Sequence, residues 1–141
     1  MNLYAKSANT YLTQRILGAT PEQQAALIME AGQLHLGKAI HALTQDNLPA
    51  AIKSFIRVSE VIMEATVRLN HESGGELAQN LQNLYEWWTK EIMVASKARD
   101  TARLEAVARG MGEIRQAWEQ FHEKKTAASG EARLQLGDQV V

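Results

Sequence analysis

The sequence predicts an all-α protein: an antiparallel up-and-down four-helix bundle with an additional short N-terminal helix. Apolar residues recur at steps of three and four, which is the spacing of amphipathic helices, and no stretch alternates as a half-buried strand would. Only two prolines interrupt the 141 residues. Capping residues precede the periodic segments, and the short links between segments place successive helices antiparallel.

The first long helix is expected to run from Pro21 to about Gln45. Thr20 and Gln23 have the spacing of a capping box, and proline suits the first helical position. Its predicted apolar face comprises Leu27, Ala31 and Leu34, with Ile28, His35, Ala39 and Ala42 beside them.

Asp46 and Asn47 end this helix and cap the second, in which Pro49 lies in the tolerated first turn. Heptad spacing in the second helix predicts a buried seam. The seam comprises Ile52, Phe55, Ser59, Ile62, Thr66 and Leu69.

Ser73 to Glu76 has the form of a second capping box, in which Gly74 and Gly75 let the chain turn tightly into the third helix. The core stripe predicted for this helix is Leu77, Leu81, Leu84, Trp88, Ile92 and Ala95.

Asp100 is the expected N-cap of the last helix. The stripe predicted there is Leu104, Val107, Met111, Ile114, Trp118 and Phe121. Gly110 and Gly112 each cost roughly 1 kcal/mol relative to alanine. They indicate either a close approach between helices or a tolerated weakness.

Residues 1–125 are therefore expected to form a single helical-bundle domain, in which 3–17 form the short N-terminal helix. Residues 126–141 lose the periodicity and are predicted to be a flexible C-terminal tail.

Composition excludes several classes of function. The 15 Lys and Arg are balanced by 16 Asp and Glu with interspersed signs, which argues against a nucleic-acid surface. The absence of cysteine excludes thiolate metal sites and suits a reducing compartment. No apolar run is long enough for stable membrane insertion, and the first residues do not resemble a secretory signal. A cytoplasmic protein is expected.

The search for catalytic, cofactor-binding or metal-ligating residues predicts none. Glu119 and His122 form one ExxH pair, but a di-iron site in a bundle needs a second pair and further glutamates. We interpret this pair as part of a solvated helix end with Lys124 and Lys125. His35 is interpreted as a bundle histidine, and an enzyme is not expected.

More apolar residues are present than one seam requires. They are Ile56, Val58, Val61 and Met63 in the second long helix, and Tyr85 and Trp87 in the third. Two accounts stay open: these helices are buried on two sides, or the residues line a groove that accepts an amphipathic helix of a partner.

An ordered set of residues resembles the flagellin-specific export chaperones of the FliS family over about residues 4–121. The set comprises Tyr11, Ala19-Thr20-Pro21, Gly74-Gly75-Glu76, Asn80-Leu81, Leu84-Tyr85, Ala95, Asp100, Val107 and Ala117-Trp118. In this resemblance, Gly74, Gly75, Glu76, Asn80 and Trp118 form the structural motif.

The resemblance implies a helical bundle that binds the C-terminal segment of flagellin in the cytoplasm. Such a chaperone prevents premature polymerisation and brings flagellin to the flagellar type III export gate. It needs no cofactor. The resemblance also implies that the N-terminal segment, with Tyr4, Ala8 and Tyr11, contacts the export gate.

The chain departs from the family pattern at two places. Met29 and Glu30 stand where an aromatic and an aspartate are usual, and Ala8 stands where an aliphatic residue is usual. Two other functions stay open, namely an adaptor for a different protein client and a small-molecule enzyme built on a helical bundle. The sequence leaves the oligomeric state open between monomer and homodimer.

Overall fold

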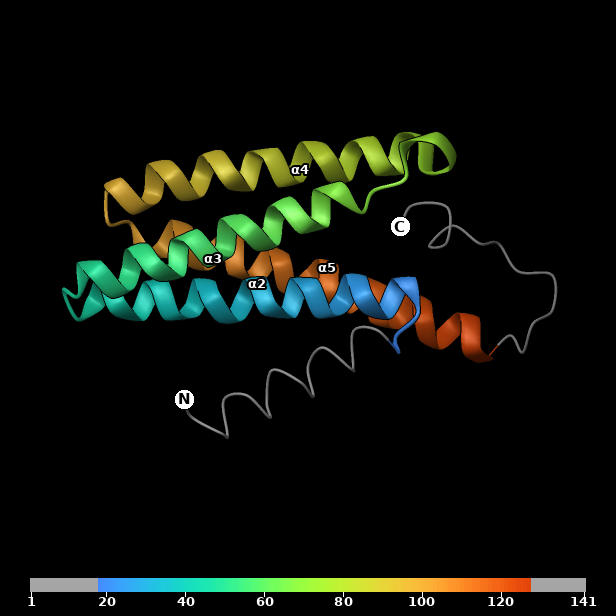
Figure 1. Cartoon of the computed structure of the whole chain (residues 1–141), viewed down its shortest axis with the longest axis horizontal. Coiled ribbons are helices and arrows are strands. Elements are labelled where there is room, and N and C mark those ends of the chain that lie inside the picture. Colours follow the sequence, from blue (N-terminus) through green and yellow to red (C-terminus); the bar gives the residue numbers. More distant parts are fainter. Residues whose placement is uncertain (1–17, 128–141) are drawn as a thin grey trace.

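The computed structural model describes residues 18–127, which form four α-helices and no strand (Figure 1). These helices are α2 (Pro21–Thr44), α3 (Leu48–Val67), α4 (His71–Lys97) and α5 (Thr101–Ala127). Consecutive helices run in opposite directions (Figure 1). The all-α class and the four long helices are confirmed, whereas the predicted short N-terminal helix and nearly all of the predicted tail lie outside the described residues.

Three predicted caps form the expected hydrogen bonds. The Thr20 side chain accepts from the Gln23 amide while the Gln23 side chain accepts from the Thr20 amide, which completes the capping box. At the start of α3, Asn47 Oδ1 accepts from the amide of Ala50. Asp100 Oδ1 accepts from the amide of Arg103 at the start of α5. Each cap satisfies a backbone donor that would otherwise lack a partner.

The start of α4 differs from the prediction. The helix begins at His71, two residues before Ser73, because the side chain of Asn70 accepts from the Ser73 amide and caps an additional first turn. The turn predicted before the helix lies inside it, at Gly75, where φ is 54° and ψ is −128° and the helix is interrupted. A residue with a Cβ rarely adopts this backbone conformation, so glycine is needed here.

Helix α2 lies between α3 and α5 and packs most extensively on both. Small residues allow this close approach: a Cβ at Gly32 would lie 3.0 Å from Met111 Sδ and 3.3 Å from Val61 Cγ1. A Cβ at Gly112 would lie 2.6 Å from the Gln33 side-chain nitrogen, which donates to the Ala108 carbonyl at 3.1 Å. Close helix packing therefore explains Gly112.

The apolar stripes of α4 and α5 are buried largely as predicted. Leu81, Trp88, Ile92 and Ala95 of α4 are buried. So are Leu104, Val107, Met111 and Trp118 of α5. Leu34 of α2 is a correction, because its side chain is 56% exposed although it was predicted on the apolar face.

The seam predicted for α3 is confirmed at Ile62 and Leu69, which are buried, and wrong at Ile52 and Ser59, because the packed face of the helix is turned toward Ala51, Val58 and Ala65. Ile52 is 51% exposed and Ser59 is also exposed. The buried positions of α3 are Ala51, Val58, Ile62 and Ala65. Ala51 and Ala65 let this side of α3 lie close to its neighbours, whereas Ile52, Ile56, Met63 and Val67 face outward.

Candidate functional site

The structure sorts the six candidate groove residues into buried, partly buried and exposed positions. Val58 is fully buried and Tyr85 is 3% exposed, so both belong to the core and are not exposed groove residues. Val61 is partly buried beside Gly32. Large apolar surfaces are exposed at Ile56, Met63 and Trp87.

Ile56 and Met63 belong to a row of exposed apolar side chains along α3, which the exposed Ser59 interrupts near its middle. We call this face the α3 stripe; it comprises Leu48, Ile52, Ile56, Met63 and Val67, whose exposed fractions lie between 47% and 74%. Residues three, four or seven apart share one side of a helix, so these side chains form a single surface. An unpartnered apolar surface of this kind usually marks an interaction site.

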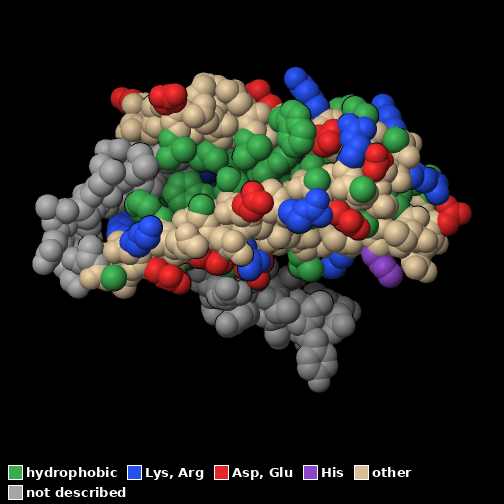
Figure 2. All heavy atoms as spheres, turned by 180° about the vertical axis from the view of Figure 1, so that it is seen from behind, with side chains coloured by type: hydrophobic (Ala, Val, Ile, Leu, Met, Phe, Trp, Pro, Cys, Tyr) green, Lys and Arg blue, Asp and Glu red, His purple; other side chains and the backbone are tan. Residues whose placement is uncertain are grey.

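Trp87 belongs to a different surface. Glu91, four residues later on the same side of α4, forms an ion pair with Arg103 of α5. Trp87 therefore lies on the flank of α4 that faces α5, whereas the α3 stripe is on another helix. The view from behind shows apolar side chains gathered in a hollow between α4, at the top, and α5 (Figure 2). The exposed candidate residues thus lie on two separate apolar surfaces.

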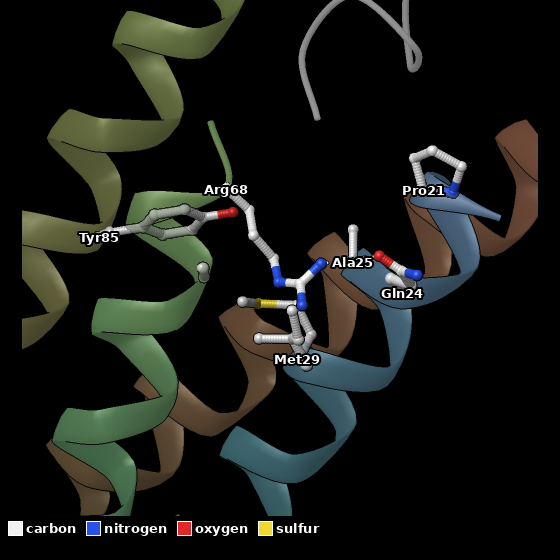
Figure 3. Close-up of a pocket in the computed structure, with 8 residues that line it drawn as sticks. Pro21, Gln24, Ala25, Met29, Arg68 and Tyr85 are labelled. Atoms are coloured by element: carbon white, nitrogen blue, oxygen red, sulfur yellow. Dashed lines mark hydrogen bonds between the residues drawn. The ribbon is translucent and has the colours of Figure 1, made fainter. Parts of the chain in front are cut away.

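A small pocket of about 260 Å³ opens between α2, α3 and α4 (Figure 3). Its apolar lining comprises Pro21, Ala25, Ile28, Met29, Ala65 and the ring of Tyr85. Arg68 bridges α3 and α2, because Nη1 donates to Gln24 Oε1 at 2.7 Å. Burial raises the pKa of Tyr85 to about 12, so its hydroxyl is neutral at physiological pH. The pocket suits one apolar side chain with a hydrogen-bonding group at its rim.

Met29, one of the departures from the family pattern, is 2% exposed and lines this pocket, whereas Glu30 points to solvent. Met29 therefore contributes to the shape of the pocket. Glu30 contributes a charge at the surface.

The residues of the structural motif have distinct positions. Gly74 and Trp118 are buried, Gly75 forms the break in α4, and Glu76 and Asn80 are exposed. Tyr4, Ala8 and Tyr11 lie outside the described residues.

His122 and Lys125 are not at a solvated helix end, which corrects the sequence interpretation. Nδ1 of His122 lies 3.1 Å from Oε1 of Glu22, and Nζ of Lys125 lies 3.3 Å from the same oxygen. The Glu22 side chain is fully buried. Burial opposes its charge, but hydrogen bonds with His122 and its own backbone, together with Lys125, lower its pKa.

The other candidate chemical groups offer little for catalysis. Residues 18–127 contain no group of three His, Cys, Asp or Glu that could hold a metal ion. His35 is partly buried, and burial, assisted by Lys38 and Arg57, lowers its pKa. No helix of this region is long and apolar enough to cross a membrane.

The sequence reasoning missed the ends of the α3 stripe and the polar rim of the pocket. Leu48, Ile52 and Ile56 recur every four residues, and this signal was available in the sequence. Gln24 and Arg68 are 44 residues apart, so their contact required the fold.

Exposed apolar faces on a helical scaffold are typical of proteins that bind other proteins. Comparison with known proteins agrees with this class. The profile of the family described as "Flagellar protein FliS" matches residues 4–125. The chain therefore belongs to the FliS family.

Three relatives have similar lengths and modest identity. Flagellar secretion chaperone FliSB of Pseudomonas aeruginosa is 28% identical over 105 residues, which are 74% of this chain and 83% of the relative. Flagellar secretion chaperone FliS of Vibrio cholerae is 26% identical, with coverage of 76% and 79%. The Salmonella typhimurium protein of the same name is 25% identical, with coverage of 83% and 87%.

Proposed function

We propose that the protein is a cytoplasmic flagellar secretion chaperone that binds the C-terminal segment of flagellin. Bound in this way, flagellin does not polymerise prematurely and is delivered to the export gate. The observation that carries the proposal is the α3 stripe in a chain of the FliS family. Neither a cofactor nor catalysis is needed, because the protein acts by covering apolar surface.

The physical chemistry of the stripe fits an amphipathic client. From Leu48 to Val67 the stripe spans 20 residues of α3, so it is about 30 Å long. An amphipathic helix of similar length would cover it by helix-in-groove recognition. Segments that are disordered before assembly lose entropy when they order on a chaperone, which keeps affinity moderate and allows release.

Trp87 and the pocket beside Met29 provide further contact points for the same client. Aromatic residues often dominate the binding energy of protein interfaces, and an apolar pocket gives specificity to one side chain. Because the α3 stripe and Trp87 lie on separate flanks, a client that uses both passes around the bundle.

The N-terminal segment has a separate proposed role. We expect residues 1–17, through Tyr4, Ala8 and Tyr11, to contact the export gate and to be displaced by the client. Deleting 1–17 should preserve or tighten flagellin binding, and Tyr11→Ala should weaken contact with the gate only. Hydrogen exchange tests this, since greater protection of 1–17 upon flagellin binding would contradict displacement.

Co-expression with the flagellin of the same organism tests the proposed client. Full-length flagellin should co-purify in a one-to-one complex, measured by size-exclusion chromatography with light scattering. Flagellin without its C-terminal segment should not. Equal recovery of both forms would contradict the proposal.

A further inference from the structure

The second half of α4 has an exposed surface that is both apolar and basic. Trp87, Met93 and Val94 are 53%, 51% and 52% exposed, and Lys90 and Lys97 are exposed beside them. Positions 87, 90, 94 and 97 are separated by steps of three and four, so their side chains share one side of the helix. We call this surface the α4 basic face; it comprises Trp87, Lys90, Met93, Val94 and Lys97.

The positive charge of this face is largely uncompensated. Every exposed charged residue between positions 87 and 99 is basic, namely Lys90, Lys97 and Arg99. The one acid in this stretch, Glu91, is only partly exposed and is paired with Arg103. Arg99 pairs with the exposed Asp46 at 2.7 Å. Lys90 and Lys97 form no ion pair with another residue of 18–127, so they are available to an anionic partner.

The other exposed helix faces carry different charges. The α3 stripe is flanked by both signs, because Lys53 and Arg57 precede Glu60 and Glu64. Helix α5 exposes mainly acids. Its exposed charged residues are Glu105, Arg109, Glu113, Glu119, Glu123 and Lys124. An anionic surface is therefore attracted to the α4 basic face and repelled by α5, which orients the protein even though the whole chain has a net charge of −1.

The shape of the α4 basic face favours a flat partner. Helix α4 lies at the edge of the bundle and packs on its neighbours less extensively than α2 does (Figure 1). Its buried residues Tyr85, Trp88, Ile92 and Ala95 point inward, so the face lies on the outer, convex side of the helix. A partner helix is usually held in a concave groove, whereas a convex helix face can lie against a planar surface.

The chemistry of the face matches the surface of a membrane that contains anionic lipids. Tryptophan is enriched at membrane–water interfaces because its ring is amphipathic. Helices that lie in this interface combine exposed apolar residues with lysines, and they bind through apolar burial together with attraction to anionic headgroups. Lysine stems cover apolar surface while their ammonium groups reach the phosphates. An acidic protein segment would pair with the lysines but would leave Trp87, Met93 and Val94 exposed.

We infer that the α4 basic face is a peripheral membrane-binding surface, which holds the bundle against anionic lipids with α4 parallel to the membrane. From position 87 to position 97 the face is only about 15 Å long, so binding is weak and reversible. This inference goes beyond the proposed function and is tested without flagellin. Trp87 is also a proposed client contact, whereas Lys90 and Lys97 are not, so the lysines separate the two roles.

Flotation of the full chain with lipid vesicles measures this binding. Vesicles of phosphatidylcholine with about one third phosphatidylglycerol should carry the protein upward in a density gradient, whereas vesicles of phosphatidylcholine alone should not. Raising the salt concentration from about 0.05 to 0.5 M should weaken binding, because ions screen the attraction between exposed charges and the lipid.

Two pairs of lysine variants test where the lipid binds. Lys90→Glu combined with Lys97→Glu should lower the partition coefficient about tenfold or more, since each cation near an anionic surface contributes about fivefold. Lys38→Glu combined with Lys53→Glu is the matched control, because it changes the net charge equally at exposed positions of α2 and α3. The control should change binding less than about twofold, since these charges lie away from the lipid. Circular dichroism verifies that both variants are folded.

Tryptophan fluorescence tests which side of α4 meets the lipid. Of the three tryptophans, Trp87 is exposed, whereas Trp88 and Trp118 are 2% and 7% exposed. Anionic vesicles should shift the emission to shorter wavelength, and Trp87→Phe should abolish this shift. A wild type that does not bind anionic vesicles would overturn the inference and would favour an acidic protein partner. Equal losses in the two lysine pairs, or binding without a change in Trp87 emission, would overturn it as well.

Discussion

Nδ1 of His122, near the end of α5, lies 3.1 Å from the buried carboxylate of Glu22 at the start of α2. Lys125 approaches the same carboxylate oxygen at 3.3 Å. These contacts join two helix ends that are 100 residues apart in the sequence. They hold the last turns of α5 beside the first turn of α2.

The contacts of Glu22 predict a dependence of stability on pH. Burial opposes the charge, but the bonds with His122 and Lys125 outweigh it and hold the pKa below the usual 4.5. The stabilisation is therefore present above that value and is lost as the pH falls through the lower folded-state pKa. Glu22→Gln should cost about 2 kcal/mol at neutral pH, as expected for hydrogen bonds to a charged group.

Urea denaturation at pH 7 and at several values below 4.5 measures this effect. The difference between wild type and Glu22→Gln should shrink as the pH falls. Glu119→Gln is the control, because it removes only a surface pair with Arg115 and should cost less than about 1 kcal/mol. A constant difference between wild type and Glu22→Gln at every pH would show that the carboxylate is not charged in the fold.

Two tryptophans separate stability from binding. Trp118 is 7% exposed and packs edge to face with Phe121 at 6.3 Å between ring centroids, whereas Trp87 is 53% exposed. Trp118→Ala should lower the free energy of unfolding by about 3–5 kcal/mol. Trp87→Ala should change it by less than about 1 kcal/mol and instead weaken flagellin binding. Thermal denaturation and flagellin-binding assays on both variants test this. A stable Trp118→Ala variant together with a destabilised Trp87→Ala variant would contradict it.

Two glycines predict opposite effects of the same substitution. A Cβ would have open space at both Gly37 and Gly75, but Gly75 has φ of 54° and Gly37 is helical. Gly75→Ala should therefore destabilise the protein by about 1–3 kcal/mol through backbone strain. Gly37→Ala should stabilise it by about 0.5–1 kcal/mol. Chemical denaturation measures both, and a stabilising Gly75→Ala would mean that the break in α4 is not required.

Local capping residues predicted three of the four helix starts, whereas the additional first turn of α4, capped by Asn70, was not predicted. Capping chemistry is local, so Thr20, Asn47 and Asp100 identified three helix starts. Large apolar residues identified the stripes of α4 and α5, where Trp88 and Trp118 give strong signals.

The rotation of α3 was not predictable from the same signals. Ala51 and Ala65 contribute little to an apolar pattern, although their small size determines which side of α3 packs inward. A large residue such as Ile52 was therefore predicted in the core, whereas it lies on the surface. The burial of Glu22 likewise depends on contacts with α5, and no local pattern indicates it.

Titration calorimetry with the purified C-terminal segment of flagellin tests the central claim most directly. The account predicts one site per chain for the wild type and binding weakened about tenfold or more by Met63→Glu, which places a charge within the α3 stripe. Leu34→Glu is the control, since Leu34 is also exposed, at 56% against 67% for Met63, but lies on α2. Unchanged affinity in Met63→Glu, or equal losses in both variants, would contradict the assignment of the α3 stripe as the binding surface.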